Sequence, residues 1–203
     1  MSKTAAAPAS TQEREQALQT LFEALHAAPY AHDFFALLRR VDSLRPDAPR
    51  FGRAQRPSQE AMRLGQEPEL DFAPAALATF AREGGAAPRL GVRFFGLLGP
   101  QGPMPLHFTE YVRERLRFRN DPTPARFLDI FHHRLLTLFY RAWAESQPVV
   151  QHDRPSEDRF AAWLGATFGH GSAGRTDRTR DRSDLRLRPD TSFLLRRHGA
   201  HHA

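Results

Sequence analysis

Residues 94–143 read FFGLLGPQGPMPLHFTEYVRERLRFRNDPTPARFLDIFHHRLLTLFYRAW. The stretch opens as a strand-like apolar run, turns at a corner rich in glycine and proline (residues 96–105), and continues as two helix-like segments. Glycine permits backbone angles that other residues avoid, whereas proline fixes φ and removes a hydrogen-bond donor. The corner is therefore predicted to be a stiff, shaped turn rather than a loose linker.

The second helix-like segment, about residues 125–144, is apolar on most of its circumference. The preceding Asp121 and Thr123 are good capping residues, and a proline in the first turn costs no hydrogen bond, so a helix is predicted to begin here. The apolar side chains are Phe127, Leu128, Ile130, Phe131, Leu135, Leu136, Leu138, Phe139 and Trp143. A helix apolar nearly all round must be enclosed. We expect a partner chain to provide part of that enclosure.

The rest of the chain predicts a mainly helical α+β fold. Apolar residues at helical spacing favour one helix from Thr11 and another over residues 34–41, with Arg39 and Arg40 pointing outward. Further helices are predicted over residues 106–119 and 157–168. Residues 61–64, 70–72 and 89–98 read as strands, and residues 75–81 are ambiguous between helix and strand. These strands are expected to form a small antiparallel region at about residues 58–98.

Composition limits the classes of function. The chain has no cysteine, which excludes disulfides and thiolate chemistry, and no apolar run long enough to cross a bilayer. Its N-terminus lacks the apolar core of a signal peptide. Eight Arg and four Asp lie in residues 170–203, so four of the six net positive charges belong to that segment rather than to the body.

Three regions are expected along the chain. Residues 1–11 are predicted to be flexible, residues 12–168 to form the folded body, and residues 169–203 to form a disordered basic tail. The composition changes abruptly near Gly169. We interpret the tail as out-of-frame translation in preference to a natural basic arm.

Candidate chemistry is sparse. Asp129 and His133 lie four residues apart on the long helix, but nothing else in the body clearly completes a metal site, so we interpret the pair as a buried histidine held by a carboxylate. His107 with Glu110 reads as an interaction at a helix start. The corner lacks the lysine of a phosphate loop, and its prolines remove the N–H groups that would bind an anion. The sequence therefore predicts no catalytic, cofactor-binding or metal-ligating residue and no cofactor.

Several long motifs resemble the TssG family, also called ImpH or VasB, of the type VI secretion baseplate. The chief ones are RFFGLLGPQGPMPLHFTEYVRERLR (93–117) and DPTPARFLDIFHHRLLTLFYRAWA (121–144), supported by DFFALLRRVD (33–42), RLGQEPELDFAP (63–74) and QPVVQHDRPSEDRFAAWLG (147–165). The resemblance covers about residues 20–168. Because family members usually continue further, we expect a truncated member.

The resemblance implies a structural role without catalysis. It implies assembly with TssF and TssK in a baseplate wedge, which surrounds the VgrG spike and supports sheath and tube assembly together with TssE. The implied location is the cytoplasmic face of the bacterial inner membrane, with no direct membrane insertion and no nucleic acid. The alternative is a nucleic-acid-binding protein that uses the arginine-rich tail. The expected assembly and partner-binding core is Gly96, Gly99, Pro100, Gly102, Pro103, Phe127, Phe131, Leu135, Phe139 and Trp143.

Overall fold

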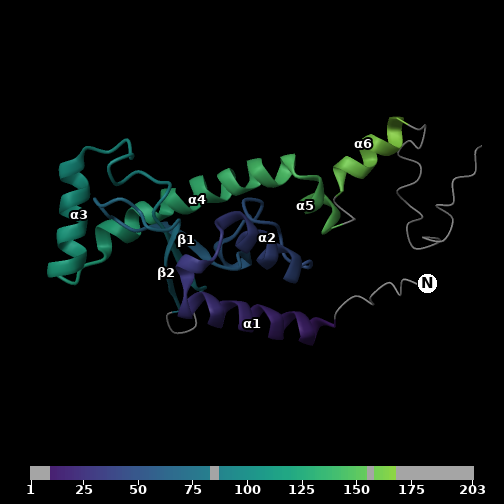
Figure 1. Cartoon of the computed structure of the whole chain (residues 1–203), viewed down its shortest axis with the longest axis horizontal. Helices are drawn as coiled ribbons and strands as arrows, with labels where there is room; N and C mark the ends of the chain where they lie inside the picture. The colour runs from purple at the N-terminus through teal and green to yellow at the C-terminus, as the bar shows by residue number, and fades with distance from the viewer. Residues whose placement is uncertain (1–9, 83–86, 155–157, 168–203) are drawn as a thin grey trace, which may run out of the picture. The chain divides into compact units, whose positions relative to one another are not determined.

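A computed structural model describes residues 10–82, 87–154 and 158–167 (Figure 1). It divides into two units, residues 1–158 and residues 159–203. The first unit contains helices α1 (Thr11–Ala27), α2 (Phe34–Leu44), α3 (Leu106–Phe118), α4 (Thr123–Ser146) and α5 (Pro148–His152), two 3₁₀ turns (Pro29–Ala31 and Pro57–Gln59), and strands β1 (Arg63–Gln66), β2 (Leu77–Ala81) and β3 (Arg89–Val92). The second contains α6 (Arg159–Thr167). The predicted tail, residues 169–203, lies outside the described residues.

The three strands form a mixed sheet in the order β1-β3-β2. The predicted α+β class is confirmed, but the expected antiparallel pairing holds only for β2 with β3, since β1 and β3 run parallel. The ambiguous residues 75–81 supply a strand. The strand expected at residues 70–72 is absent, and Phe72 is fully exposed there. Prolines on both sides of that segment lack the N–H that a paired strand needs.

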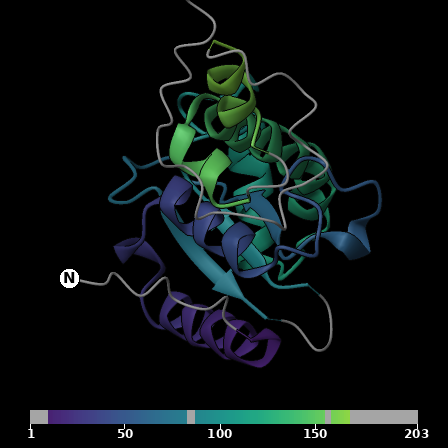
Figure 2. The same ribbon diagram turned by 90° about the vertical axis from the view of Figure 1, so that its right-hand side faces the viewer.

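The sheet lies between α4 and α1 in two perpendicular views (Figures 1 and 2). Helix α4 packs mainly on β1, and α1 packs on α2 and β2. The main core lies between these layers and includes Phe22, Leu25, Phe34, Leu38, Val41, Leu64, Leu90, Leu136 and Tyr140. A smaller core joins the corner to α3 and α4 through Leu98, Val112, Ala125 and Leu128.

Side-chain caps begin helices α1 and α2, and an aspartate precedes α4. Ser10 caps α1 in a capping box with Glu13, one residue before the expected start, and Asp33 caps α2. Asp121 accepts the N–H of Thr123 at 3.0 Å, as its position before α4 predicts. The arginine side chain of Arg154 donates three hydrogen bonds of 2.8 Å to carbonyls at the end of α2 and in the turn that follows it. This arginine ties the segment after α5 to the end of α2.

The predicted corner is a series of bends and turns that is fixed by its neighbours. Gly99 has a φ of 92°, and its N–H donates to the hydroxyl of Thr109 at 3.0 Å. Gly102 is needed for space instead, because a Cβ there would lie 2.4 Å from the carbonyl oxygen of Leu97. The corner is thus a shaped turn whose backbone is held by side chains from other elements.

Candidate functional site

Helix α4 has one buried and one exposed apolar side. The buried side contains Ala125, Leu128, His132, Leu136, Thr137, Tyr140 and Ala144. The exposed side contains Phe127, Phe131, Leu135, Leu138 and Phe139, which we call the α4 aromatic face. Phe127 is 60% exposed and Phe131 is 49% exposed. The described part of this chain therefore encloses α4 on one side only, and the other side stays exposed.

The two ends of the α4 aromatic face differ in how firmly they are held. At the C-terminal end, Phe139 stacks on Phe95 with ring centroids 5.2 Å apart and also contacts Phe35 at 5.4 Å. Trp143 is half-buried against Phe35. At the N-terminal end, Phe127 and Phe131 contact each other at 5.8 Å, and both rings remain exposed. The face is therefore a preformed aromatic surface rather than a set of separate side chains.

The corner residues of the predicted assembly core lie beside the N-terminal half of α4. Gly99 is buried and Gly96 is half-buried, whereas Pro100 and Pro103 are exposed. The corner reaches α4 through the N–H of Leu97, which donates to His132 Nε2 at 3.1 Å. The structure thus brings the corner and α4 together, with Pro100 and Pro103 at the surface.

Polar side chains of α4 cover the free edge of β1. Strand β1 uses one side for β3, where the N–H of Glu67, just beyond its end, donates to the carbonyl of Val92 at 2.9 Å. On its other side, the N–H of Leu64 donates to His133 Nδ1 and the N–H of Gln66 donates to Asp129 Oδ1, each at 3.1 Å. An open strand edge is a template for unwanted pairing. Side chains of α4 therefore accept the hydrogen bonds that another strand would otherwise accept at this edge.

Both histidines of α4 act as neutral acceptors of a backbone N–H. His133 accepts from Leu64 through Nδ1, so its Nε2 carries the proton and donates to Glu60. His132 is fully buried, accepts from Leu97 through Nε2, and donates from Nδ1 to Asp129 at 3.2 Å. Burial lowers the pKa of His133, against the opposing effect of Glu60. The interpretation of a buried histidine held by a carboxylate is correct, but the partner of Asp129 is His132 and not His133.

Asp129 is the centre of this polar junction. Besides the N–H of Gln66 and the ring of His132, it accepts the guanidinium Nε of Arg89 at 2.8 Å. Burial alone would raise the pKa of this carboxyl, but the hydrogen bonds from His132 and Arg89 outweigh it and leave the pKa below its usual value. A Cβ at position 65 would lie 2.5 Å from Asp129 Oδ1, so Gly65 permits the close approach of α4 to the strand.

Sequence reasoning missed three partners in this junction: Glu60, Gln66 and Arg89. Gln66 is buried, and its amide forms a pair of hydrogen bonds with the backbone of Leu98, at 2.7 and 2.8 Å. Of these three residues, only Gln66 lies in a motif quoted for the family resemblance, RLGQEPELDFAP, and that motif was the only sequence signal that pointed to any of them. In the described ranges no group of three or more His, Cys, Asp or Glu side chains is arranged to hold a metal ion.

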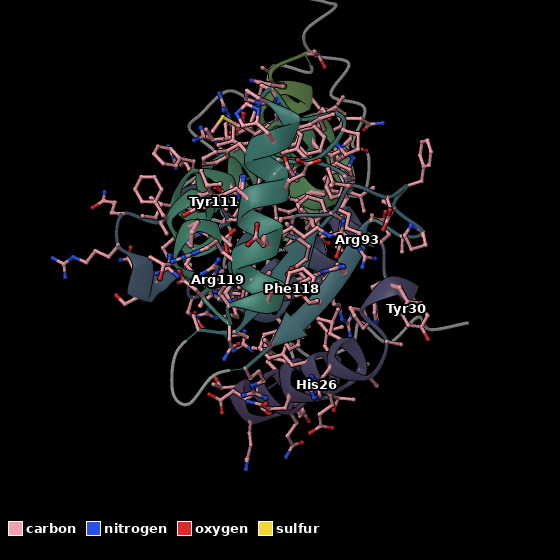
Figure 3. The ribbon with its side chains drawn as sticks, turned by 90° about the vertical axis from the view of Figure 1, so that its left-hand side faces the viewer. His26, Tyr30, Arg93, Tyr111, Phe118 and Arg119 are labelled. Carbon is pink, nitrogen blue, oxygen red and sulfur yellow. The ribbon has the colours of Figure 1, made fainter. Side chains whose placement is uncertain are left out.

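The arginines of α3 are paired within the chain. Arg117 donates to Glu69 at 2.6 Å, and Arg115 binds Asp121. The acidic groups that bind these arginines come from neighbouring segments of the same chain. Figure 3 shows the side that carries Tyr111, Phe118 and Arg119 along α3. His107 and Glu110 of the predicted His–carboxylate pair are both exposed.

Asp42 is a buried carboxylate near the end of α2. It is 6% exposed, and its Oδ1 accepts the N–H of Phe51 at 3.3 Å. Burial raises the pKa of Asp42 to about 6, against the opposing effect of the Arg154 guanidinium. The same carboxylate and burial raise the pKa of Tyr140. A charged Asp42 is therefore costly to the fold at neutral pH.

The substitution Asp42→Asn tests this cost through its pH dependence. The folded-state pKa of about 6 lies above the ordinary 3.8, so the native state binds the proton more tightly and the carboxyl favours folding most below pH 3.8. That contribution is lost as pH rises through 6. Relative to the unsubstituted protein, the variant should gain about 3 kcal/mol between about pH 4 and about pH 7. Urea unfolding at several pH values measures the difference.

The pH dependence that His133 contributes to stability does not disturb this comparison. The lowered pKa of His133 reduces stability as the pH falls below its ordinary 6.5, which is the opposite direction, and it does so in both proteins. The histidine effect therefore cancels in the difference between the two unfolding free energies. Unfolding free energies that run parallel across this pH range would show that Asp42 is not a costly charge.

These features define an α+β protein whose polar groups join helix to sheet and whose longest helix exposes an aromatic face. A family model described as "Type VI secretion, TssG" matches residues 28–201. The chain belongs to the TssG family and is a type VI secretion baseplate subunit. The match continues past residue 165, where the quoted motifs end. Comparison with curated proteins and with solved structures found no match.

No helix in the described ranges combines the length and the apolar character that a membrane crossing requires.

Proposed function

We propose that this chain is a structural subunit of the baseplate wedge, which assembles with TssF and TssK and acts by shape and buried area rather than by catalysis. In this proposal it works at the cytoplasmic face of the inner membrane, next to the VgrG spike and TssE. The family membership supports the general role. The specific partners are the proposed part.

The observation that carries the proposal is the α4 aromatic face. The five large apolar side chains of this face are exposed, whereas the opposite side of α4 is buried in the core. Contiguous exposed apolar surface of this kind marks protein interaction sites, and aromatic residues contribute most to such interfaces. We place the TssF contact on this face, with the exposed prolines of the corner next to it.

The polar junction supports a structural role rather than catalysis. Asp129 and both histidines already hold backbone N–H groups or side chains of the same chain. A general acid or base needs a free hydrogen-bonding position toward its substrate. These groups are used to attach α4 to the sheet, which fixes the position of the α4 aromatic face.

The substitution Phe131→Asp tests the proposal. Because Phe131 is 49% exposed, the carboxylate stays hydrated in the free subunit, and the folded state should persist. In the complex the charge would be buried without a partner, so the affinity for TssF should fall by about 2 kcal/mol or more, which is roughly thirtyfold. Co-purification of tagged TssF with each variant measures the loss, and circular dichroism checks the fold.

Phe72→Asp is the matched control, since Phe72 is fully exposed but lies far along the chain from α4. It introduces the same charge by the same exchange and should leave co-purification unchanged. Normal recovery of TssF with folded Phe131→Asp would contradict the assignment of the interface to this face. Equal losses of TssF recovery with Phe131→Asp and Phe72→Asp would mean that the added charge, and not its position, causes the loss.

A further inference from the structure

A groove lies along α4 next to the α4 aromatic face. Its volume is about 600 Å³, and it is bounded by α4, the edge of β1 and the segment around residues 54–56. The α4 residues that line it include Arg126, Ile130 and Arg134, at intervals of four. Each precedes a residue of the α4 aromatic face, so the two rows are about 100° apart around the helix.

The groove has an apolar floor with a surplus of positive charge. Ile130 is 66% exposed, and alanines and Leu64 continue the apolar lining. The charged lining residues are Arg56, Arg63, Arg89, Arg126 and Arg134 against Glu60 and Asp129.

The two carboxylates are already occupied by groups of the chain. Glu60 binds Arg63 and His133, and Asp129 binds Arg89.

Two of the arginines remain available to a ligand. Arg56 and Arg134 are exposed and have no carboxylate partner among the described residues. The guanidinium of Arg134 reaches only the carbonyl of Gly52, at 3.4 Å. A guanidinium binds carboxylates through paired, directional hydrogen bonds, and it is more readily desolvated than an ammonium group. Together with the exposed Ile130, these arginines form a surface with positive charge and an apolar centre, and no carboxylate in the described part of the chain binds the two arginines.

We propose that this groove binds an acidic peptide segment of another protein. An aliphatic side chain of the segment lies over Ile130, and flanking carboxylates bind Arg56 and Arg134. The volume of about 600 Å³ falls within the range of roughly 300–1,000 Å³ found for ligand sites. This is a second docking surface that adjoins the α4 aromatic face, and the proposal does not depend on which partner covers that face.

The test uses the full chain and a fluorescein-labelled hexapeptide, EDLLDE, with SSLLSS as the uncharged counterpart. Fluorescence anisotropy should show saturable binding of the acidic peptide only. The double variant Arg56→Glu/Arg134→Glu should weaken that binding by about tenfold or more. The matched control is Arg40→Glu/Arg119→Glu, which changes the net charge equally at two exposed arginines outside the groove. It should bind almost as the unsubstituted protein does.

Three outcomes would overturn the proposal. One is no saturable binding of the acidic peptide, and a second is equal loss in both double variants, which would indicate a general charge effect. The third is a single-stranded oligonucleotide that displaces the peptide through the same two arginines at lower concentration, which would make the groove a nucleic-acid site. Phe131→Asp, measured in the same anisotropy assay, should bind the acidic peptide normally because Phe131 does not line the groove, and this separates the two proposals.

Discussion

Replacing Asp129 with alanine should lower the free energy of unfolding by about 3–5 kcal/mol, the range for breaking a buried ion pair from one side. The variant leaves the Arg89 side chain, only 15% exposed, with Glu67 as its remaining carboxylate partner. It also leaves the N–H of Gln66 without its acceptor at the edge of β1. Against a typical total stability of about 5–15 kcal/mol, such a loss should be visible as a large shift of the urea midpoint.

Asp71→Ala is the matched control for this experiment. Asp71 is 82% exposed and lies 3.8 Å from Arg113, so its loss should change stability by no more than about 0.5 kcal/mol. Asp129→Asn adds a finer test, because it keeps an acceptor for the backbone N–H but removes the charge opposite Arg89. A midpoint for Asp129→Ala that matches the Asp71→Ala control would contradict the central place of Asp129 in the junction.

The second large effect contrasts two adjacent leucines of α4. Leu136 is fully buried in the main core, so Leu136→Ala should destabilise the fold by about 2–5 kcal/mol. Leu135 is 38% exposed on the α4 aromatic face, and Leu135→Ala should cost less than about 1 kcal/mol. The same exchange at neighbouring positions controls for helix propensity, and urea unfolding of the two variants measures both values.

The two leucine variants should also separate stability from assembly. Leu135→Ala should weaken the recovery of TssF while the fold remains intact, because it removes contact area only from the exposed face. Similar unfolding free energies for the two variants would mean that α4 does not have distinct buried and exposed sides. Such a result would also remove the basis for the interface on the α4 aromatic face.

Much of the secondary structure was predictable because its signals are local. The corner, the start of α4 after Asp121, and the helices α1 to α4 follow from capping residues, proline positions and apolar spacing. The sheet was harder to predict. Strand direction depends on which segments meet in space, and the parallel pairing of β1 with β3 has no local signature. The expected strand at residues 70–72 failed for a local reason, because the prolines on both sides of it lack the N–H that a paired strand needs.

The candidate site was predictable only in part. Its helix, its corner and the role of the histidines as buried structural groups were expected from sequence. The contacts from β3 and from the loop before β1 were not, since Glu60 and Arg89 are 73 and 40 residues from the α4 side chains that they bind. Even within α4, a spacing of four favoured His133 as the partner of Asp129, whereas the packing against β1 selected His132.

The sequence by itself determined the helices α1 to α4, the stiff corner, the apolar character of the longest helix and the resemblance to TssG. These depend on residue types within a few positions of one another and on the order of motifs along the chain. Only the tertiary structure decided which side of α4 is buried, which backbone N–H groups bind its histidines, and which arginines of the groove lack a carboxylate partner among the described residues. The physical reason is that burial and pairing depend on groups brought together by folding, and apolar spacing alone does not distinguish a core side from an exposed one when nearly the whole helix is apolar.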